Sequence, residues 1–308
     1  MLRISSSDQF LDPYSFTEAL RYLYGGPLLE PRGFVHDLQA FNLNFHNPNI
    51  PTVAQQRMEH ALAYVTSGFL LQVPPVLMRG IEIVKGLLRW DTVEKALAFA
   101  LENLPVSSSP KSGTSSAEVG ALSKRTHDLK STRLMNGIVD FLVYNFPTDF
   151  TLDTTVSQLM ANPRLPTVTG SRPSTSTSNP RLGLIRFGEV PLEETSHPDF
   201  VTRLLSTMLL SLPFTQLKSV LKHHGIGRRL GWDKVGRVMH AVIEEREARR
   251  LQVSKSKRVS SSTTEAAGEL WQNVQWEEQI EPDSQHGSGL TIVRVWKGAD
   301  GSDADESG

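Results

Sequence analysis

Apolar residues recur at helical spacing along most of the chain. The spacing i, i+3, i+4 and i+7 predicts helices over residues 16–24, 56–72, 74–86, 91–104, 133–146, 199–212, 214–224 and 234–250. Runs with strand character are few and short, at residues 2–5, 182–187 and 290–296. The pattern therefore predicts a mainly α fold with a few short strands.

The first predicted helix has a clear start and stop. Asp12 or Ser15 is positioned to cap it, and Gly25 follows its last turn. Its expected buried face consists of Phe16, Ala19, Leu20 and Leu23. This face requires a partner, which the helix predicted over residues 56–72 can provide.

Segments rich in Ser, Thr, Pro and Gly separate the helical regions. Such segments bury too little apolar surface to offset chain entropy, so we expect linkers at 104–132 and a disordered segment at 163–181. The predicted domains are residues 1–103 and residues 133–251. Residues 252–308 are expected to form a mostly disordered tail with a short strand at 290–296.

Composition narrows the function classes. Lys and Arg total 32 against 33 Asp and Glu, and this balance gives no overall field that would attract nucleic acid or an acidic membrane surface. The apolar runs are interrupted too often to span a membrane. The chain contains no cysteine, which suits a reducing compartment. We therefore expect a cytoplasmic or nuclear protein with no nucleic-acid or membrane partner.

No motif indicates an enzyme. The run "HHGIGRRLG" at 223–231 follows a predicted helix, whereas a phosphate-binding loop follows a strand. His223, His224 and His240 lack the spacing of metal ligands. The carboxylates and arginines between Glu244 and Arg250 have the pattern of a solvated helix face. The sequence predicts no catalytic, cofactor-binding or metal-binding residues.

Two stretches at the N-terminal end resemble the second half of a BTB/POZ domain, and their residues are most similar to those of fungal BTB proteins. The stretches are "LRISSSDQFLDPYSFTEALRYLYGG" and "RMEHALAYVTSGFLLQVPPVLMRGIEIV". The matching positions are Phe16, Leu20, Leu23, Tyr24, Gly25, Ala61, Ala63, Leu71, Gln72, Val73, Pro74 and Leu77. The segment around "LLSLPF" is similar to the helical BACK region that often follows a BTB domain.

The resemblance implies the C-terminal half of a BTB/POZ-like fold followed by a BACK-like helical region. The implied function is a non-enzymatic protein–protein interaction module with a protein partner. One alternative is a substrate adaptor of a cullin-type ubiquitin ligase, and another is a nuclear regulatory protein. The family's dimer elements precede the matched region, so the resemblance leaves homo- or heterodimer formation open.

Candidate interaction residues are aromatic. Tyr22 and Tyr24 have side chains suited to half-buried contacts, although such residues also seal the ends of core helices. Trp296 lies with Trp271 and Trp276 near the C-terminus, where these segments are expected to form either a small hairpin docked on the helices or a peptide that adds to a partner's sheet. Ser260 and Ser261 follow a basic run, which is either a phosphorylation segment or a solvated linker.

Overall fold

The computed structural model describes residues 10–30, 53–102, 132–159, 164–166, 197–257, 271–285 and 287–297. The chain divides into two compact units, Met1–Leu142 and Val143–Gly308, which are called unit 1 and unit 2 below. The described residues are mainly helical and include one antiparallel sheet of two strands, so the predicted mainly α class is confirmed. The expected strands at 2–5 and 182–187 lie outside the described residues.

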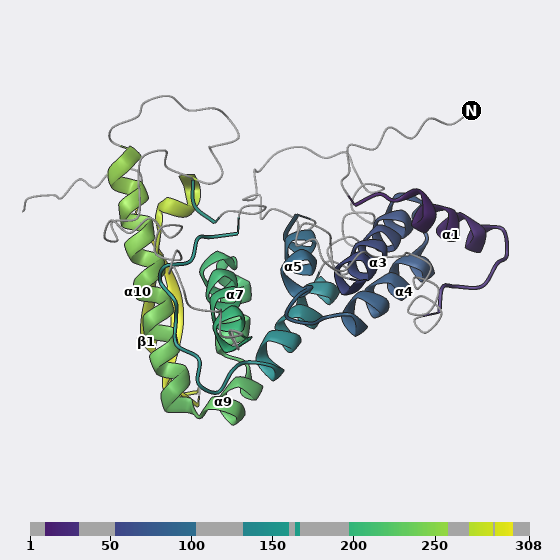
Figure 1. Ribbon diagram of the computed structural model, residues 1–308. Helices are drawn as coiled ribbons and strands as arrows, with labels where there is room; N and C mark the ends of the chain where they lie inside the picture. Colours follow the sequence, from purple (N-terminus) through teal and green to yellow (C-terminus); the bar gives the residue numbers. More distant parts are fainter. Residues whose placement is uncertain are drawn as a thin grey trace, which may run out of the picture. The chain divides into compact units, whose positions relative to one another are not determined.

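Unit 1 is built from helices. They are α1 (Pro13–Leu23), α3 (Val53–Leu70), α4 (Pro74–Gly86), α5 (Val93–Glu102) and a helix that begins at residue 132. In Figure 1, α1 lies against α3, and α3 lies beside α4. The buried apolar residues of α3, α4 and α5 form the core of the unit.

Asp12 caps α1. Its Oδ2 atom accepts a hydrogen bond from the Ser15 backbone N–H at 3.0 Å, and Pro13 occupies the first turn, where its missing N–H costs nothing. The helix ends at Leu23, and Gly25 follows with a φ of +87°. Of the two predicted caps, the structure therefore selects Asp12.

The buried face of α1 differs from the predicted one. Ser15 and Ala19 are the buried residues of the helix, whereas Leu23 is 52% exposed. Ala19 packs against Tyr64 of α3, because its small side chain allows this large ring to approach the helix. Of the predicted face, Ala19 is therefore buried, Phe16 and Leu20 are half-buried and Leu23 is exposed.

Glycines allow α3 and α4 to pack closely. A Cβ atom added at Gly68 would lie 2.6 Å from the backbone nitrogen of Leu77, and one at Gly80 would lie 2.7 Å from a methyl group of Val65. Each helix thus places a glycine where the other helix comes nearest. This pairing fixes how the two helices meet.

Unit 2 contains helices and a hairpin. The helices are α7 (His197–Ser211), α8 (Phe214–Leu221), α9 (His224–Leu230) and α10 (Trp232–Lys257), and the strands are β1 (Trp276–Pro282) and β2 (Leu290–Trp296). The glycine run at 223–231 forms α9, in which Gly225 and Gly227 are buried. Its glycines serve packing, since a Cβ at Gly227 would lie 2.3 Å from the Trp232 ring.

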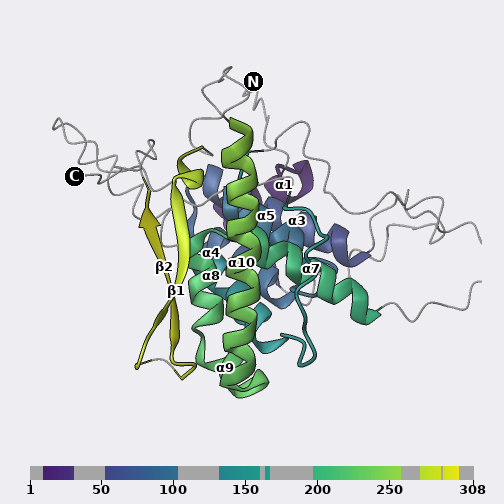
Figure 2. The ribbon, with the colours of Figure 1, turned by 90° about the vertical axis from the view of Figure 1, so that its left-hand side faces the viewer.

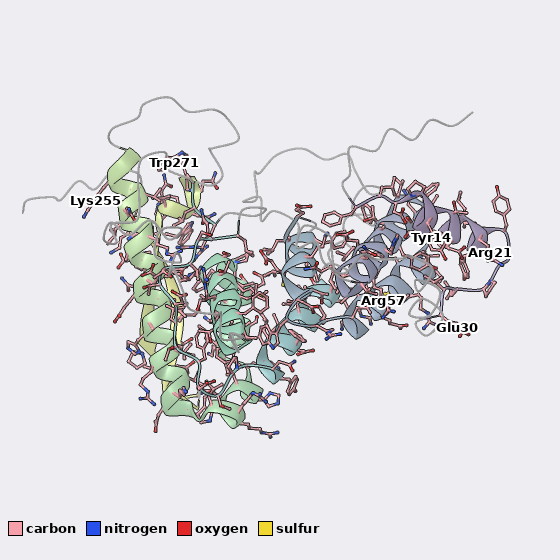
Figure 3. The ribbon with its side chains drawn as sticks, viewed as in Figure 1. Tyr14, Arg21, Glu30, Arg57, Lys255 and Trp271 are labelled. Carbon is pink, nitrogen blue, oxygen red and sulfur yellow. The ribbon has the colours of Figure 1, made fainter. Side chains whose placement is uncertain are left out.

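The hairpin lies along α10. Figure 2 shows β1 between β2 and α10, and β1 contacts this helix. The strands pair antiparallel, with Trp276 opposite Trp296 and Glu278 opposite Arg294. In Figure 3, Trp271 lies near the same end of α10 as Lys255, and its ring packs against a small cluster of Leu165, Val253 and Val274.

Candidate interaction surface

The predicted aromatic residues occupy three different environments. Tyr24 follows α1 and is 89% exposed. Tyr22 is half-buried and packs on the buried cluster of Ala19, Tyr64, Val73 and Val76. It therefore covers the core at the end of α1. Trp296 lies in unit 2 and is 49% exposed. Ser260 and Ser261 fall outside the described residues.

Trp296 forms an aromatic pair with the residue opposite it. The centroids of the Trp276 and Trp296 rings are 4.9 Å apart, and the rings meet edge to face at 69°. The neighbouring Val295 is also exposed. This end of the hairpin therefore presents the ring pair of Trp276 and Trp296 on one face of the sheet and Val295 on the other, because successive strand residues point to opposite faces. The predicted hairpin docked on the helices is the arrangement that the structure adopts.

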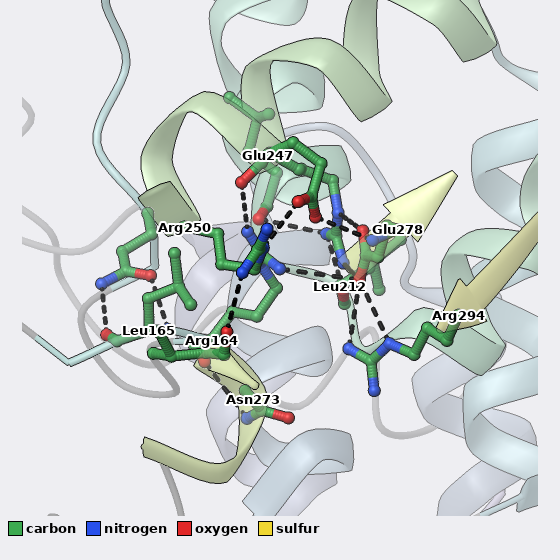
Figure 4. Close-up of polar contacts among 12 residues, drawn as sticks. Arg164, Leu165, Leu212, Glu247, Arg250, Asn273, Glu278 and Arg294 are labelled. Atoms are coloured by element: carbon green, nitrogen blue, oxygen red, sulfur yellow. Dashed lines mark hydrogen bonds and ion pairs between the residues drawn. The ribbon is translucent and has the colours of Figure 1, made fainter. Parts of the chain in front are cut away.

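A buried ion pair anchors this hairpin. The Arg246 guanidinium on α10 contacts the Glu278 carboxylate on β1 with both Nε and Nη2, at 2.6 and 2.9 Å. Figure 4 shows the polar contacts that converge on Glu278. Neither the Arg246 nor the Glu278 side chain is exposed to solvent. Bidentate arginine–carboxylate pairs are strong and directional because two parallel hydrogen bonds fix their geometry.

Arg246 also closes the end of α7. Its Nη1 atom donates to the carbonyl oxygens of Leu209, Leu210 and Leu212, at 3.0, 3.2 and 2.9 Å. The last carbonyl groups of a helix have no partner within the helix, so a buried helix end needs donors of this kind. One side chain therefore holds α7, α10 and β1 together.

Glu278 has three arginine partners. Besides Arg246, Arg294 donates to its Oε1 atom at 3.1 Å, and the Nη1 atom of Arg164 lies 3.6 Å from the same oxygen. Burial by itself raises the pKa of Glu278, but the hydrogen bonds from Arg246 and the charges of the three arginines outweigh it and lower the pKa to about 2. Glu278 is therefore ionised at neutral pH.

Arg164 is less well satisfied than Arg246. Its Nη2 atom donates to the Arg246 carbonyl at 2.9 Å, while Nε and Nη1 are buried without a hydrogen-bond partner. Burial, followed by the nearby charge of Arg246, lowers the pKa of Arg164 to about 9. Residues 164–166 belong to the segment 163–181 for which the sequence predicts disorder, yet Arg164 and Leu165 are buried.

Glu247 blocks one edge of the sheet. Its Oε1 atom accepts a hydrogen bond from the Glu278 backbone N–H at 2.9 Å, and its Oε2 atom accepts one from Arg250. Arg250 in turn donates to the Val274 carbonyl at 3.0 Å. Pro282, at the far end of β1, has no N–H to offer. The outer edge of β1 is thus closed at two points.

The outer edge of β2 carries backbone groups that β1 does not bind, and it is covered at Ile292, which has no solvent exposure. Two backbone hydrogen bonds flank the ladder: Asp283 N–H donates to the Gly289 carbonyl, and Lys297 N–H donates to the Gln275 carbonyl. They show which residue pairs across the two strands are hydrogen-bonded. Because such pairs alternate in an antiparallel ladder, the backbone groups of Ile292, Arg294 and Trp296 point away from β1. Within the described residues no partner is found for these outward groups, whereas Ser288 binds those of Leu290.

The remaining polar groupings have structural roles. Asp12, Ser15 and His60 are the residue types of a hydrolase triad, but the Ser15 hydroxyl donates to Asp12 Oδ2 at 3.0 Å and to the main-chain carbonyl of His60 at 3.1 Å, an arrangement that ties the start of α1 to α3. Burial raises the pKa of Asp12, and the hydrogen bonds from Ser15 and His60 outweigh it and lower the pKa. Among the described residues no group of His, Asp and Glu side chains is arranged to bind a metal.

The sequence interpretation of residues 244–250 as a solvated face is wrong for two arginines. Arg246 and Arg250 are buried. The signal that identifies Arg246 is its phase: Met239, Val242 and Arg246 lie at i, i+3 and i+7 on the buried stripe of α10. A buried arginine in that phase needs a carboxylate partner. The spacing of residues along the sequence does not show that this partner is Glu278.

The chain is not matched by any protein-family model, curated protein or solved structure. In the described part of the chain, no helix is both long enough and apolar enough to cross a membrane.

Proposed function

We propose that the chain is a non-enzymatic protein–protein interaction module and that it binds protein partners through the Trp296 end of the β2 edge. The observation that carries this proposal is the pair of residues Arg294 and Trp296, whose outward backbone groups have no partner within the described residues. An extended peptide can add to such an edge as a further strand, gaining main-chain hydrogen bonds.

The side chains around this edge suit a protein partner. Trp296 and Val295 are exposed beside the open groups, and the Trp276 ring supports Trp296 from the opposite strand. Tryptophan is enriched at the energetic centres of interfaces because it buries a large apolar area. The edge therefore combines main-chain donors and acceptors with an apolar contact that would confer selectivity.

The base of the hairpin is rigid. The buried pair of Arg246 and Glu278 ties β1 to α10 and to the end of α7. A preformed strand loses less conformational freedom on binding than a flexible one, which favours affinity. The arginine cluster thus supports the proposal by holding the binding strand in place.

For unit 1 we propose the BTB/POZ-like identity that the sequence resemblance implies, with a BACK-like region after it. This part rests on the quoted motifs, which fall on α1, α3 and α4 and on the turn before Pro74. The exposed Tyr24 at the end of α1 is a second candidate contact of the module.

Site-directed photo-crosslinking in the native cells tests the proposed function. A photoreactive phenylalanine analogue replaces Val295 in one variant and Glu281, on the outer face of β1, in the control. We expect crosslinked protein from the Val295 position and much less from the Glu281 position. Equal capture at both positions, or none at Val295, would overturn the proposal. The identity of a captured protein decides between a cullin, a nuclear regulator and another class of partner.

A further inference from the structure

We propose that His223 is a pH-sensitive cap of helix α9. Its neutral ring closes the first turn of this helix, and its protonated ring leaves that turn open. The cap belongs to the helical part of unit 2, so it is independent of the proposed binding at β2.

The cap depends on one nitrogen atom of the ring. His223 precedes α9 with an extended backbone, and its Nδ1 atom accepts a hydrogen bond from the Gly225 backbone N–H at 3.0 Å. The first N–H groups of a helix have no partner within the helix, so they need acceptors of this kind. An imidazole nitrogen accepts a hydrogen bond only while it carries no proton. The bond therefore requires a neutral His223 ring with its proton on Nε2.

Protonation removes this acceptor. Both nitrogen atoms of an imidazolium ring are donors, so the Nδ1–H of a protonated His223 would face the Gly225 N–H and neither group could accept. Histidine is the side chain that ordinarily changes its charge between about pH 5 and pH 8. The first turn of α9 is therefore capped at about pH 7.5 and loses its cap as the pH falls toward about 5.5.

A second histidine lies against the cap. The His224 ring stacks on the His223 ring, with the two centroids 4.6 Å apart and the planes inclined by 24°. Helix α9 carries two further basic residues, Arg228 and Arg229, in its last turn. If both imidazole rings took up a proton, two like charges would lie face to face.

The other elements around the cap contribute one cation, one phenol ring and two carboxylates. Lys222, at the end of α8, contacts the Asp283 carboxylate of the hairpin turn at 2.7 Å, so this carboxylate already has a cationic partner. The Tyr144 ring meets the His223 ring edge to face, with centroids 5.9 Å apart. The helix of Tyr144 carries Asp140 one turn earlier.

The capped turn is part of a close contact within unit 2. Gly225 is buried, and a Cβ atom added to it would lie 2.9 Å from a methyl group of Val143. The main chain bends tightly here, because the Ile226 N–H donates to the His223 carbonyl at 3.0 Å. Loss of the cap therefore loosens the turn that packs on Val143 and Tyr144.

NMR on the full-length protein tests the cap in two ways. Nitrogen-15 shifts of the imidazole rings report the tautomer, and we expect His223 to carry its proton on Nε2 at about pH 7.5. Hydrogen exchange gives the protection factor of the Gly225 amide, which is corrected for the intrinsic pH dependence of exchange. We expect this factor to fall about fivefold or more between about pH 7.5 and pH 5.5, as the loss of one helix cap implies.

Two variants make the test specific. In His223→Asn the side-chain oxygen can accept the same hydrogen bond without titrating, because asparagine is a preferred cap residue, so the protection of Gly225 should stay constant over this pH range. His224→Asn is the matched control: it removes the neighbouring histidine and leaves the cap in place, so its response should follow the wild type. Circular dichroism shows that each variant is folded before it is scored.

A proton on Nδ1 of His223 at neutral pH would overturn the inference, and this measurement needs only the wild type. A wild-type Gly225 protection factor that stays constant between about pH 7.5 and pH 5.5 would overturn it as well. A His223→Asn protein that loses protection like the wild type would assign the response to another group and would also refute the cap.

Discussion

Arg246 of α10 and Glu278 of β1 form a bidentate ion pair with no solvent exposure on either side. Two nitrogen atoms of the guanidinium contact the carboxylate, and the third donates to carbonyl groups at the end of α7. Because the pair joins elements distant in the sequence, it determines where the hairpin docks on the helices of unit 2. The outward edge of β2 depends on this docking.

Replacing Arg246 should therefore strongly destabilise unit 2. In Arg246→Met, Glu278 loses its bidentate partner and the α7 carbonyl groups lose their donor, so we expect the free energy of unfolding to fall by about 3–5 kcal/mol. Urea unfolding followed by tryptophan fluorescence measures this, because Trp232, Trp271, Trp276 and Trp296 all belong to unit 2.

Arg164→Met is the matched variant for Arg246→Met. Arg164 is equally buried, but its Nε and Nη1 atoms have no hydrogen-bond partner, so the charge contributes little to offset its desolvation. We expect the unfolding free energy of this variant to lie within about 1 kcal/mol of the wild type. Equal losses in the two variants would show that burial, and not the hydrogen-bonded geometry, determines the contribution of these arginines.

Acid should weaken unit 2 through Glu278. The pKa of Glu278 is about 2 in the folded protein, below its ordinary value of 4.5. A carboxyl group with a lowered pKa contributes stability above its unfolded pKa and loses it as pH falls toward the folded value. We therefore expect the unfolding free energy to decrease as the pH falls from about 4.5 to about 2.

The control for this pH dependence is Glu278→Gln. It should be less stable than the wild type at neutral pH, and its unfolding free energy should change less between about pH 5 and pH 2. Other carboxyl groups with lowered pKa values, such as Asp153 and Glu277, account for the part that remains. Identical pH profiles for the two proteins would contradict the role given to Glu278.

In unit 1, Gly68→Ala should destabilise the pairing of α3 with α4. The added methyl group would meet the backbone of Leu77 at 2.6 Å, and backbone atoms cannot move aside easily. We expect a loss of about 1–3 kcal/mol. In Gly86→Ala, where nothing lies within 4 Å of the added Cβ, the same change should be neutral or stabilise by up to about 1 kcal/mol. Urea unfolding followed by circular dichroism compares the two, and a stabilised Gly68→Ala protein would refute the close contact.

Periodicity predicted the helices well, because a stripe of apolar residues is a local property of the sequence. Residues Val235, Met239 and Val242, for example, lie in the helix predicted over residues 234–250 and are buried on one of its faces. Helix α1 shows the limit: Ala19 of the stripe is buried, but so is the polar Ser15, whose hydroxyl binds the His60 carbonyl, whereas the apolar Leu23 is exposed.

The candidate surface was predicted only in part. The strand at 290–296 and the exposure of Trp296 follow from local composition. Strand β1 was harder to assign, because its buried inner-face residue is Glu278, a charged side chain where a strand pattern normally has an apolar one. Only the three-dimensional structure shows that Arg246, 32 residues earlier in the chain, neutralises it.

Amide hydrogen exchange along β2, measured by NMR on the dilute full-length protein, tests the Trp296 end of the β2 edge most directly. We expect slow exchange at Thr291, Val293 and Val295, whose N–H groups face β1, and fast exchange at Arg294 and Trp296, whose N–H groups face outward. Slow exchange at Arg294 and Trp296 in the dilute protein would show that this end of the edge is already covered and would contradict the proposed binding strand.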